Sequence, residues 1–233
     1  LVYLLQELQQ KDAASFIFSS SCTVYGQAEK MPITEDAPVQ QPMSPYGNTK
    51  KVGEEIIRDT AKASSINAIL LRYFNPIGAH PTAEIGELPI GVPQNLVPFI
   101  TQTAIGLRQE LSVFGDDYPT SDGTAVRDYI HVVDLAKAHV IALERLLEKK
   151  NTDRVETFNL GTGTGSSVLE VIQSFERVSG QKLPYKIVPR REGDVTEAYA
   201  NTHKANTVLG WKAESTLDEA MASAWKWEQK IRS

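Results

Sequence analysis

The sequence is poor in features that would tie it to a membrane, to nucleic acid or to an oxidising compartment. Its single cysteine, Cys22, cannot form an internal disulfide, which fits a reducing cytoplasm. The opening apolar run, residues 1–5, is far too short for a membrane span or a signal-peptide core. The net charge of −5 comes from interspersed acids and bases, so we expect no nucleic-acid partner and no membrane partner. No cluster of His, Cys and Asp has metal-ligand spacing, so no metal site is predicted.

What the sequence does contain is alternating helix and strand signals. With 233 residues, 41% of them hydrophobic, it can build one large core or two smaller ones. Apolar runs predict strands at 15–20, 67–75, 111–115, 155–160 and 185–188. Helical spacing predicts helices at 2–10, 46–64, 96–106, 131–150, 167–180 and 216–231. Stretches 27–45 and 75–94 are typical of irregular loops. This alternation predicts an α/β fold with a mostly parallel sheet.

A tyrosine and a lysine stand four residues apart where the second predicted helix begins. Tyr46 and Lys50 should therefore lie on one helix face. Ser21 ends a predicted buried strand 25 residues before Tyr46, and ligands of α/β sheets bind at such strand ends. A free tyrosine has a pKa of about 10, and a nearby ammonium should lower it. The three residues therefore suit proton abstraction from an alcohol. On pattern alone, a helix-start tyrosine and a surface lysine explain the pair equally well.

Three other features have simpler interpretations. The run "GTGTG" at 161–165 follows a strand and precedes a helix, but it fits the dinucleotide fingerprint poorly and predicts a turn. His131 stands at a helix start and is predicted to be a structural cap. Cys22 follows a strand end and is predicted to be a packed thiol.

Seven ordered segments together resemble one family. They are "FIFSSSCTVYG", "SPYGNTK", "LLRYFNPIGAHP", "GVPQNLVPFI", "VFGDDYPTSDGTAVRDYIHVVDLAKAHV", "FNLGTGTGSSVLEVI" and "RREGDV". The chain resembles the UDP-glucose 4-epimerases, a family of extended short-chain dehydrogenases/reductases, over essentially all its residues. The resemblance implies the C-terminal part of a Rossmann-type parallel sheet plus a smaller α/β substrate-binding lobe. Residues 1–77, with 131–160 returning to them, would be the remaining half of the NAD-binding domain. Residues 78–130 and 161–233 would form the UDP-sugar-binding lobe.

The resemblance also implies residue roles and partners. Tyr46 would take the sugar 4-hydroxyl proton while hydride passes to NAD, Ser21 would hydrogen-bond the 4-oxygen, and Lys50 would bind the nicotinamide ribose. The implied NAD contacts are Ser21, Tyr46, Lys50 and Phe74. The implied UDP-sugar contacts are Asn75, Asn95, Leu96, Ser112, Phe114, Arg127, Arg191, Asp194 and Ala198. A homodimer built largely on helices that include residues 47–63 is implied as well.

The sequence departs from the family pattern in two places. The family opens with Gly-x-x-Gly-x-x-Gly, whose amides approach the NAD pyrophosphate, and nothing like it precedes Ser19. We therefore expect a fragment that lacks the first half of the nucleotide-binding fold, neither holds NAD nor turns over alone, and exposes apolar surface. The second departure is Ala198, at a position whose size gates the sugar pocket. Its small side chain leads to the hypothesis that the complete enzyme also accepts UDP-GlcNAc and UDP-GalNAc.

Two rival functions stay open at this point. A nucleotide-sugar 4,6-dehydratase needs an Asp-Glu pair directly after the strand-end hydroxyl, and Cys22 and Thr23 occupy those positions. That argues against dehydratase chemistry, whereas another extended short-chain dehydrogenase/reductase acting on a nucleotide sugar is less easily excluded. The non-enzyme alternative is a nucleotide-sugar-binding module without catalysis.

Overall fold

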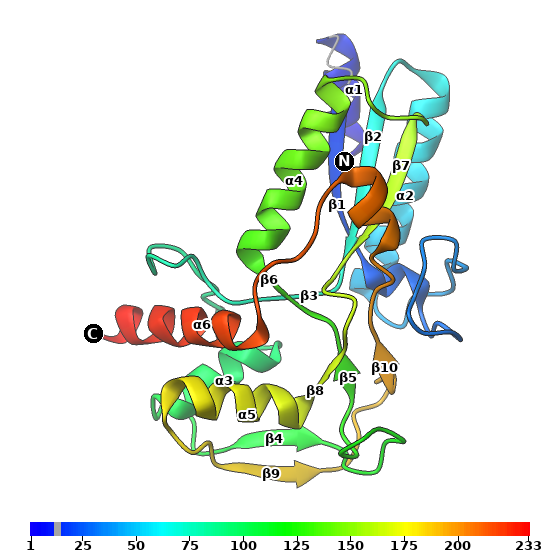
Figure 1. The fold of residues 1–233 in the computed structure, drawn as a ribbon. Coiled ribbons are helices and arrows are strands. Elements are labelled where there is room, and N and C mark those ends of the chain that lie inside the picture. Colours follow the sequence, from blue (N-terminus) through cyan, green and yellow to red (C-terminus); the bar gives the residue numbers. More distant parts are fainter. Residues whose placement is uncertain (12–14) are drawn as a thin grey trace. The chain divides into compact units, whose positions relative to one another are not determined.

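Two units are built from interleaved stretches of the chain (Figure 1). The computed structural model describes residues 1–11 and 15–233. The first unit comprises Leu1–Phe74, Ala136–Gly163 and Ala200–Lys212, and the second comprises Asn75–Leu135, Thr164–Tyr199 and Ala213–Ser233. The expected division differs from this one chiefly at residues 200–212, which belong to the first unit. The physical reason is a parallel bridge between Ile33 and Ala200, both of which are buried in one apolar cluster.

The first unit is organised around a parallel sheet with strand order β1-β2-β7. β1 is Ser15–Ser21, β2 is Asn67–Tyr73 and β7 is Val155–Leu160. Residues 68–71 of the central strand β2 are completely buried, as expected for a parallel strand covered on both faces. β1 stands at one edge of this order, and residues 16–18 on it are only partly buried.

Helices α2 (Pro45–Ala63) and α4 (Val132–Leu147) cover opposite faces of this sheet. Ser19 contacts α4 and Ser20 contacts α2, and successive strand residues point to opposite faces. α2 begins where the Ser44 side chain accepts a hydrogen bond from the Gly47 amide at 3.1 Å, with a proline at the first helical position. The unit also contains α1 (Val2–Gln10), the 3₁₀ turn η1 (Cys22–Tyr25) and the π-helix η2 (Ala205–Leu209).

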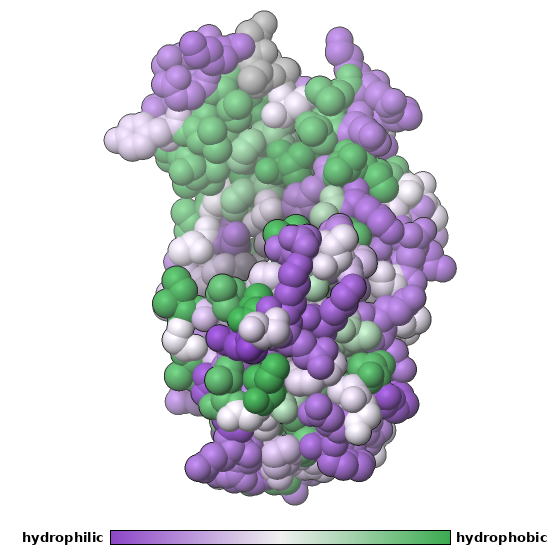
Figure 2. Space-filling view, turned by 90° about the vertical axis from the view of Figure 1, so that its left-hand side faces the viewer, coloured by the Kyte–Doolittle hydropathy of each residue, from purple (hydrophilic) through white to green (hydrophobic). Residues whose placement is uncertain are grey.

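Part of the first unit's surface is apolar, as predicted. Figure 2 shows hydrophobic residues gathered over this unit. The exposed large apolar residues of this unit include Leu1, Val2, Tyr3, Leu4, Val52, Val140, Leu143 and Leu147. An apolar surface of this kind is an aggregation liability unless something covers it.

The second unit packs three helices around one apolar core. α3 (Leu96–Ala104), α5 (Val168–Ser179) and α6 (Leu217–Arg232) supply most of it, and Phe175 meets Trp225 edge-on with ring centroids 5.5 Å apart. Capping boxes begin α5 and α6, with Ser167 paired to Glu170 in the former. The strands are short: β3 (Asn75–Ile77), β4 (Leu111–Phe114), β5 (Val126–Arg127), β6 (Tyr129–His131), β8 (Ser166–Ser167), β9 (Tyr185–Val188) and β10 (Glu197–Ala198).

All the predicted helices and strands are present within a few residues of the predicted bounds. The prediction of a mostly parallel α/β fold is confirmed, with a single antiparallel pairing, β5 with β8, in the described part. The cap at His131 is confirmed too, because its Nδ1 accepts a hydrogen bond from the Val133 amide at 3.0 Å. The missed strands are β3, β5, β6, β8 and β10, which are too short to show a period of two.

Candidate active site

The predicted catalytic residues lie at the carboxyl end of β1 and on the first turns of α2. Ser21 is the last residue of β1 and accepts hydrogen bonds from the amide and hydroxyl of Thr23 at 3.2 and 3.0 Å. The Lys50 ammonium lies 5.4 Å from the centroid of the Tyr46 ring and donates to the Ser19 carbonyl at 2.8 Å. The structure thus brings Ser21, Tyr46 and Lys50 together in the first unit, with the tyrosine half exposed.

The expected lowering of the Tyr46 pKa is wrong for this structure. Burial raises the pKa of Tyr46, and the neighbouring Tyr73 raises it further, while a hydrogen bond with Ser21 opposes both. The Lys50 ammonium, which donates to the Ser19 carbonyl and lies 5.4 Å from the Tyr46 ring centroid, is not among the main influences on this pKa. Burial also lowers the pKa of Lys50 itself. The site therefore holds the phenol of Tyr46 in its protonated form at neutral pH.

Tyr73 is a site residue that the sequence analysis missed. It is the last residue of β2, stands directly opposite Ser21 in the parallel register, and lies close enough to Tyr46 to raise the pKa of that phenol. Its ring centroid lies 6.4 Å from that of His139, whose Nε2 is 2.9 Å from the Ser19 hydroxyl. The signal was available, because two adjacent parallel strands that end together place their last residues side by side.

Phe74, the fourth expected NAD contact, is buried, as is Ser21, whereas Tyr46 is half exposed and Lys50 is partly buried. The Phe74 side chain is 4% exposed and packs in a cluster with Val24, Tyr25, Ile33 and Ala200. Little of this side chain could therefore meet a bound ligand without a rearrangement of that cluster.

Four of the expected UDP-sugar contacts form one cluster in the second unit. Asp194 lies between two arginines, with its carboxylate oxygens 3.4 Å from Nη2 of Arg127 and 3.4 Å from Nε of Arg191. The Arg191 guanidinium also lies 5.0 Å from the Phe114 ring centroid. Both ion pairs are long, so a diphosphate could replace Asp194 as the partner of either guanidinium at little cost.

The remaining expected UDP-sugar contacts lie at element ends of the same unit. Ala198 on β10 is the register partner of Arg127 on β5. Asn75 begins β3, and Ser112 is on β4 two residues before Phe114. Asn95 precedes α3, and its amide nitrogen donates to Glu87 at 2.7 Å. Leu96 is the first residue of α3 and packs against the core.

The residues present fit one end of a dinucleotide cofactor. An ammonium and two hydroxyls at parallel strand ends suit ribose hydroxyls and a carboxamide. The sequence holds no Gly-x-x-Gly-x-x-Gly for the pyrophosphate, and Gly165 of "GTGTG" is explained by packing, since a Cβ there would lie 2.3 Å from Val126. Within the described residues, no group of three or more His, Cys, Asp or Glu could hold a metal ion. The helices described, taken one by one, are also too short or too polar to cross a membrane.

Comparisons with known proteins agree on a family. The model of the GDP-mannose 4,6 dehydratase family matches residues 1–224. The UDP-glucose 4-epimerases of Mus musculus and Bacillus subtilis are each 50% identical to 98% and 97% of the chain, which spans only 65% and 66% of their lengths. The UDP-glucose 4-epimerase of Stenotrophomonas maltophila, solved with bound NAD and formylated UDP-arabinopyranose, superposes with a TM-score of 0.95 at 48% identity, covering 99% of this chain and 68% of that one. The Bifidobacterium longum enzyme, solved with NAD⁺ and UDP, gives 0.91 at 47%, with coverages of 99% and 68%.

Proposed function

The chain belongs to the GDP-mannose 4,6 dehydratase family, and we propose that the complete protein of which it is part is an NAD-dependent UDP-glucose 4-epimerase. The reaction would interconvert UDP-glucose and UDP-galactose through a transient 4-keto sugar. Because the chain spans about 65% of the length of its curated relatives, the proposal concerns the complete protein. We expect the 233 residues alone to hold no NAD and to be inactive.

The residues of the first unit would handle the proton. Ser21 would hold the 4-oxygen of the sugar, and Tyr46 would accept the 4-hydroxyl proton as the C4–H bond breaks. NAD, when bound, would supply the hydride acceptor and donor for C4 of the sugar. Tyr46 would then give the proton back to the 4-oxygen, so that no net oxidation occurs. Lys50 would bind the nicotinamide ribose, and the positive charge of an oxidised nicotinamide ring beside Tyr46 would favour the phenolate that accepts the proton.

The residues of the second unit would hold the UDP part of the substrate. Arg127 and Arg191 present planar donors that match a diphosphate, and Phe114 presents an exposed aromatic face to the uracil. Asp194 would accept hydrogen bonds from ribose hydroxyls once the arginines turn to the diphosphate. Asn75, Asn95, Leu96, Ser112 and Ala198 complete the proposed set of contacts.

The observation that carries the proposal is the pair of residues directly after Ser21. Cys22 and Thr23 stand where a 4,6-dehydratase needs an acid and a base, and the Thr23 hydroxyl donates to Ser21. No group at either position can deliver a proton to a leaving hydroxyl at neutral pH. The site can therefore oxidise and reduce C4, but it has no means of eliminating water.

We further propose that the complete enzyme accepts UDP-GlcNAc and UDP-GalNAc. Ala198 is the smallest chiral side chain, so it leaves room for an N-acetyl group beside it. Turnover of both substrate pairs would be compared between the wild type and Ala198→Tyr. Loss of only the acetylated activity in the variant supports the proposal, and a wild type inactive on the acetylated pair sinks it.

The main test uses the full-length protein. Purified enzyme would be denatured and assayed for released NAD, then assayed for conversion of UDP-galactose to UDP-glucose. Tyr46→Phe should lose activity while keeping UDP affinity, because its hydroxyl serves the chemistry and not the nucleotide. The same assays on residues 1–233 test the expectation for the fragment. Bound UDP without turnover by the full-length protein would favour the binding-module alternative.

A homodimer and a cytoplasmic location stay predictions. The former is implied by the family resemblance and is checked by light scattering of the full-length protein. The latter rests on the single cysteine of the sequence and is checked by cell fractionation.

A further inference from the structure

A carboxylate and a guanidinium are buried together next to the proposed catalytic residues. Glu54 on α2 and Arg72 on β2 are 4% and 3% exposed. Arg72 makes two hydrogen bonds to Glu54, from Nε to Oε1 at 2.8 Å and from Nη2 to Oε2 at 2.5 Å. The Ser20 hydroxyl donates to the same Oε1 at 2.6 Å. The carboxylate thus links α2 to two adjacent strands at once.

On both β1 and β2, the residue that contacts Glu54 directly precedes a residue of the candidate active site. Ser20 and Arg72 are register partners, and the next pair along the same two strands is Ser21 with Tyr73. Both of the latter lie close enough to the Tyr46 phenol to shift its pKa, Tyr73 upward and Ser21 downward. Any shift of Glu54 relative to the strand ends would therefore move the groups that surround this phenol.

On α2, Glu54 continues the helix stripe that carries the catalytic pair. Tyr46, Lys50, Glu54 and Arg58 follow one another at intervals of four residues, and so face the sheet in successive turns. Three of them are tied to strands: Lys50 to the Ser19 carbonyl at 2.8 Å, Glu54 to Ser20 and Arg72, and Arg58 to the Thr157 hydroxyl at 2.8 Å. Of these three contacts, only that of Glu54 is a buried ion pair with two hydrogen bonds, so it restricts the position and orientation of α2 more than the other two.

The far side of Arg72 is fixed as well. Its guanidinium carbon lies 4.8 Å from the centroid of the Tyr25 ring, and the Tyr25 hydroxyl donates to Asn159 Oδ1 at 2.7 Å. Asn159 in turn donates from Nδ2 to the Ile33 carbonyl at 2.9 Å. Arg72 therefore cannot swing away from Glu54 without breaking a chain of buried contacts.

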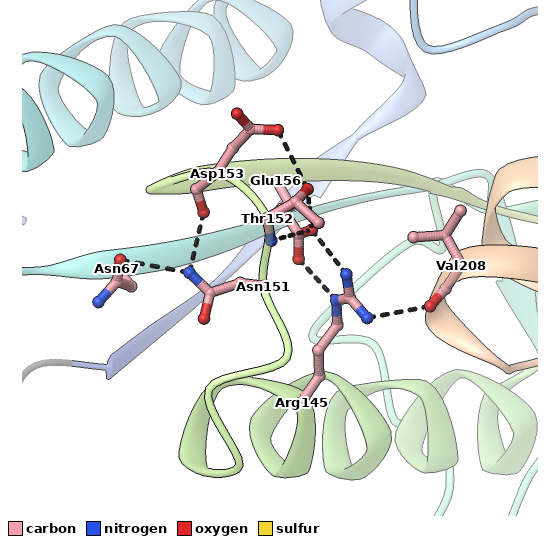
Figure 3. Close-up of polar contacts among 7 residues, drawn as sticks. All are labelled: Asn67, Arg145, Asn151, Thr152, Asp153, Glu156 and Val208. Carbon is pink, nitrogen blue, oxygen red and sulfur yellow. Dashed lines mark hydrogen bonds and ion pairs between the residues drawn. The ribbon is translucent and has the colours of Figure 1, made fainter.

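Stability alone is a poor explanation for such a pair, because burying two charges costs about as much as their attraction returns. A second Arg–Glu pair in the same unit offers a comparison (Figure 3). Arg145 on α4 bonds to Glu156 on β7 through Nε at 2.7 Å and Nη2 at 2.8 Å. Glu156 is the second residue of its strand, whereas Arg72 is the last but one of its strand. The two pairs share their chemistry and differ in which strand end they hold.

We propose that Glu54 and Arg72 are positioning residues of the reaction, which set the height and rotation of α2 so that the Tyr46 phenol meets Ser21. The inference rests on the proposed epimerase function. A misplacement of about 1 Å at a reacting group can cost about 10²-fold in rate, so loss of this tether should lower kcat by that order. The UDP affinity should be unchanged, because the UDP contacts lie on the second unit.

The test compares two double variants of the full-length protein. Glu54→Leu with Arg72→Leu removes the pair next to the site, and Glu156→Leu with Arg145→Leu removes the pair at the other strand ends. Replacing both charges avoids leaving one of them buried alone, so each variant should stay folded. For each we would measure the melting temperature, the UDP Kd, and kcat for UDP-galactose conversion. The expected result is an about 10²-fold lower kcat in the first variant only, at similar melting temperature and Kd.

Equal kcat values for the two double variants would overturn the inference. If either double variant fails to fold, Glu54→Gln and Glu156→Gln take their place, with kcat expressed per folded molecule and the same expected difference. A wild type that binds UDP without converting UDP-galactose would overturn the proposed function itself. Conversion by the wild type with no difference between the variants would overturn only the positioning role.

Discussion

The cluster around Asp194 allows a quantitative prediction for Arg191. Its side chain is 56% exposed, and its one ion pair is 3.4 Å long, so its contribution to folding should be within about 0.5 kcal/mol. A hydrogen bond from a guanidinium to a charged ligand is worth roughly 1.5–3 kcal/mol. Arg191→Ala should therefore leave the melting temperature unchanged and weaken UDP binding roughly 10- to 150-fold. Arg191→Lys should lie between, because an ammonium keeps the charge but loses the planar fork.

Arg177 provides a matched control for this experiment. It lies in the same unit, its side chain is 58% exposed, and it is paired with Asp218 at 2.7 Å. Arg177→Ala removes the same charge from the surface of α5, away from the Asp194 cluster. The Kd for UDP would be measured by titration calorimetry on the full-length variants at low and high salt. Equal weakening by both variants would mean that only the overall field matters, and no weakening by Arg191→Ala would refute the proposed diphosphate contact.

Three further predictions concern the first unit. Tyr46→Phe should lower kcat by about 10²- to 10⁴-fold with unchanged UDP affinity. Because burial raises the pKa of Tyr46, the kcat of the wild type should rise as the pH rises above neutrality. A pH-independent kcat would contradict the role of the phenolate. Burial raises the pKa of Glu156, but the hydrogen bonds from Arg145 and Thr152 outweigh it and leave a lowered pKa. The ionised Glu156 therefore contributes its full stabilisation above the pKa of about 4.3 that it has in the unfolded chain, and this contribution is lost as the pH falls through its lower pKa in the folded chain. The free energies of unfolding of the wild type and Glu156→Gln, obtained from melting curves, should differ by about 3 kcal/mol at pH 7 and converge in acid. Gly53→Ala should cost about 1–3 kcal/mol in urea unfolding, because its Cβ would lie 2.7 Å from the Phe18 ring, and Phe18→Leu in the same chain should restore part of the loss.

Much of the candidate site could be predicted because it is local in the sequence. The spacing of Tyr46 and Lys50 places them on one helix face wherever that helix lies. The apolar run 15–20 predicts a strand, and the hydroxyl residue Ser21 that follows the run therefore stands at the strand end. The structure adds the caps of α2, α5 and α6 at Ser44, Ser167 and Thr216, which are local as well but were not predicted. Seven ordered segments then supplied the family.

The sequence by itself determined which elements form, and which residue types end the strands, because propensity, capping and period act over a few neighbouring residues. Only the tertiary structure decided which strands pair and which side chains share a carboxylate. The register that sets Ser20 against Arg72, and the contact of both with Glu54, join positions far apart in the chain. The direction of the Tyr46 pKa shift was decided there as well. It depends on burial and on the nearness of Tyr73 and Ser21 to the phenol, and neither is encoded in a spacing of four residues.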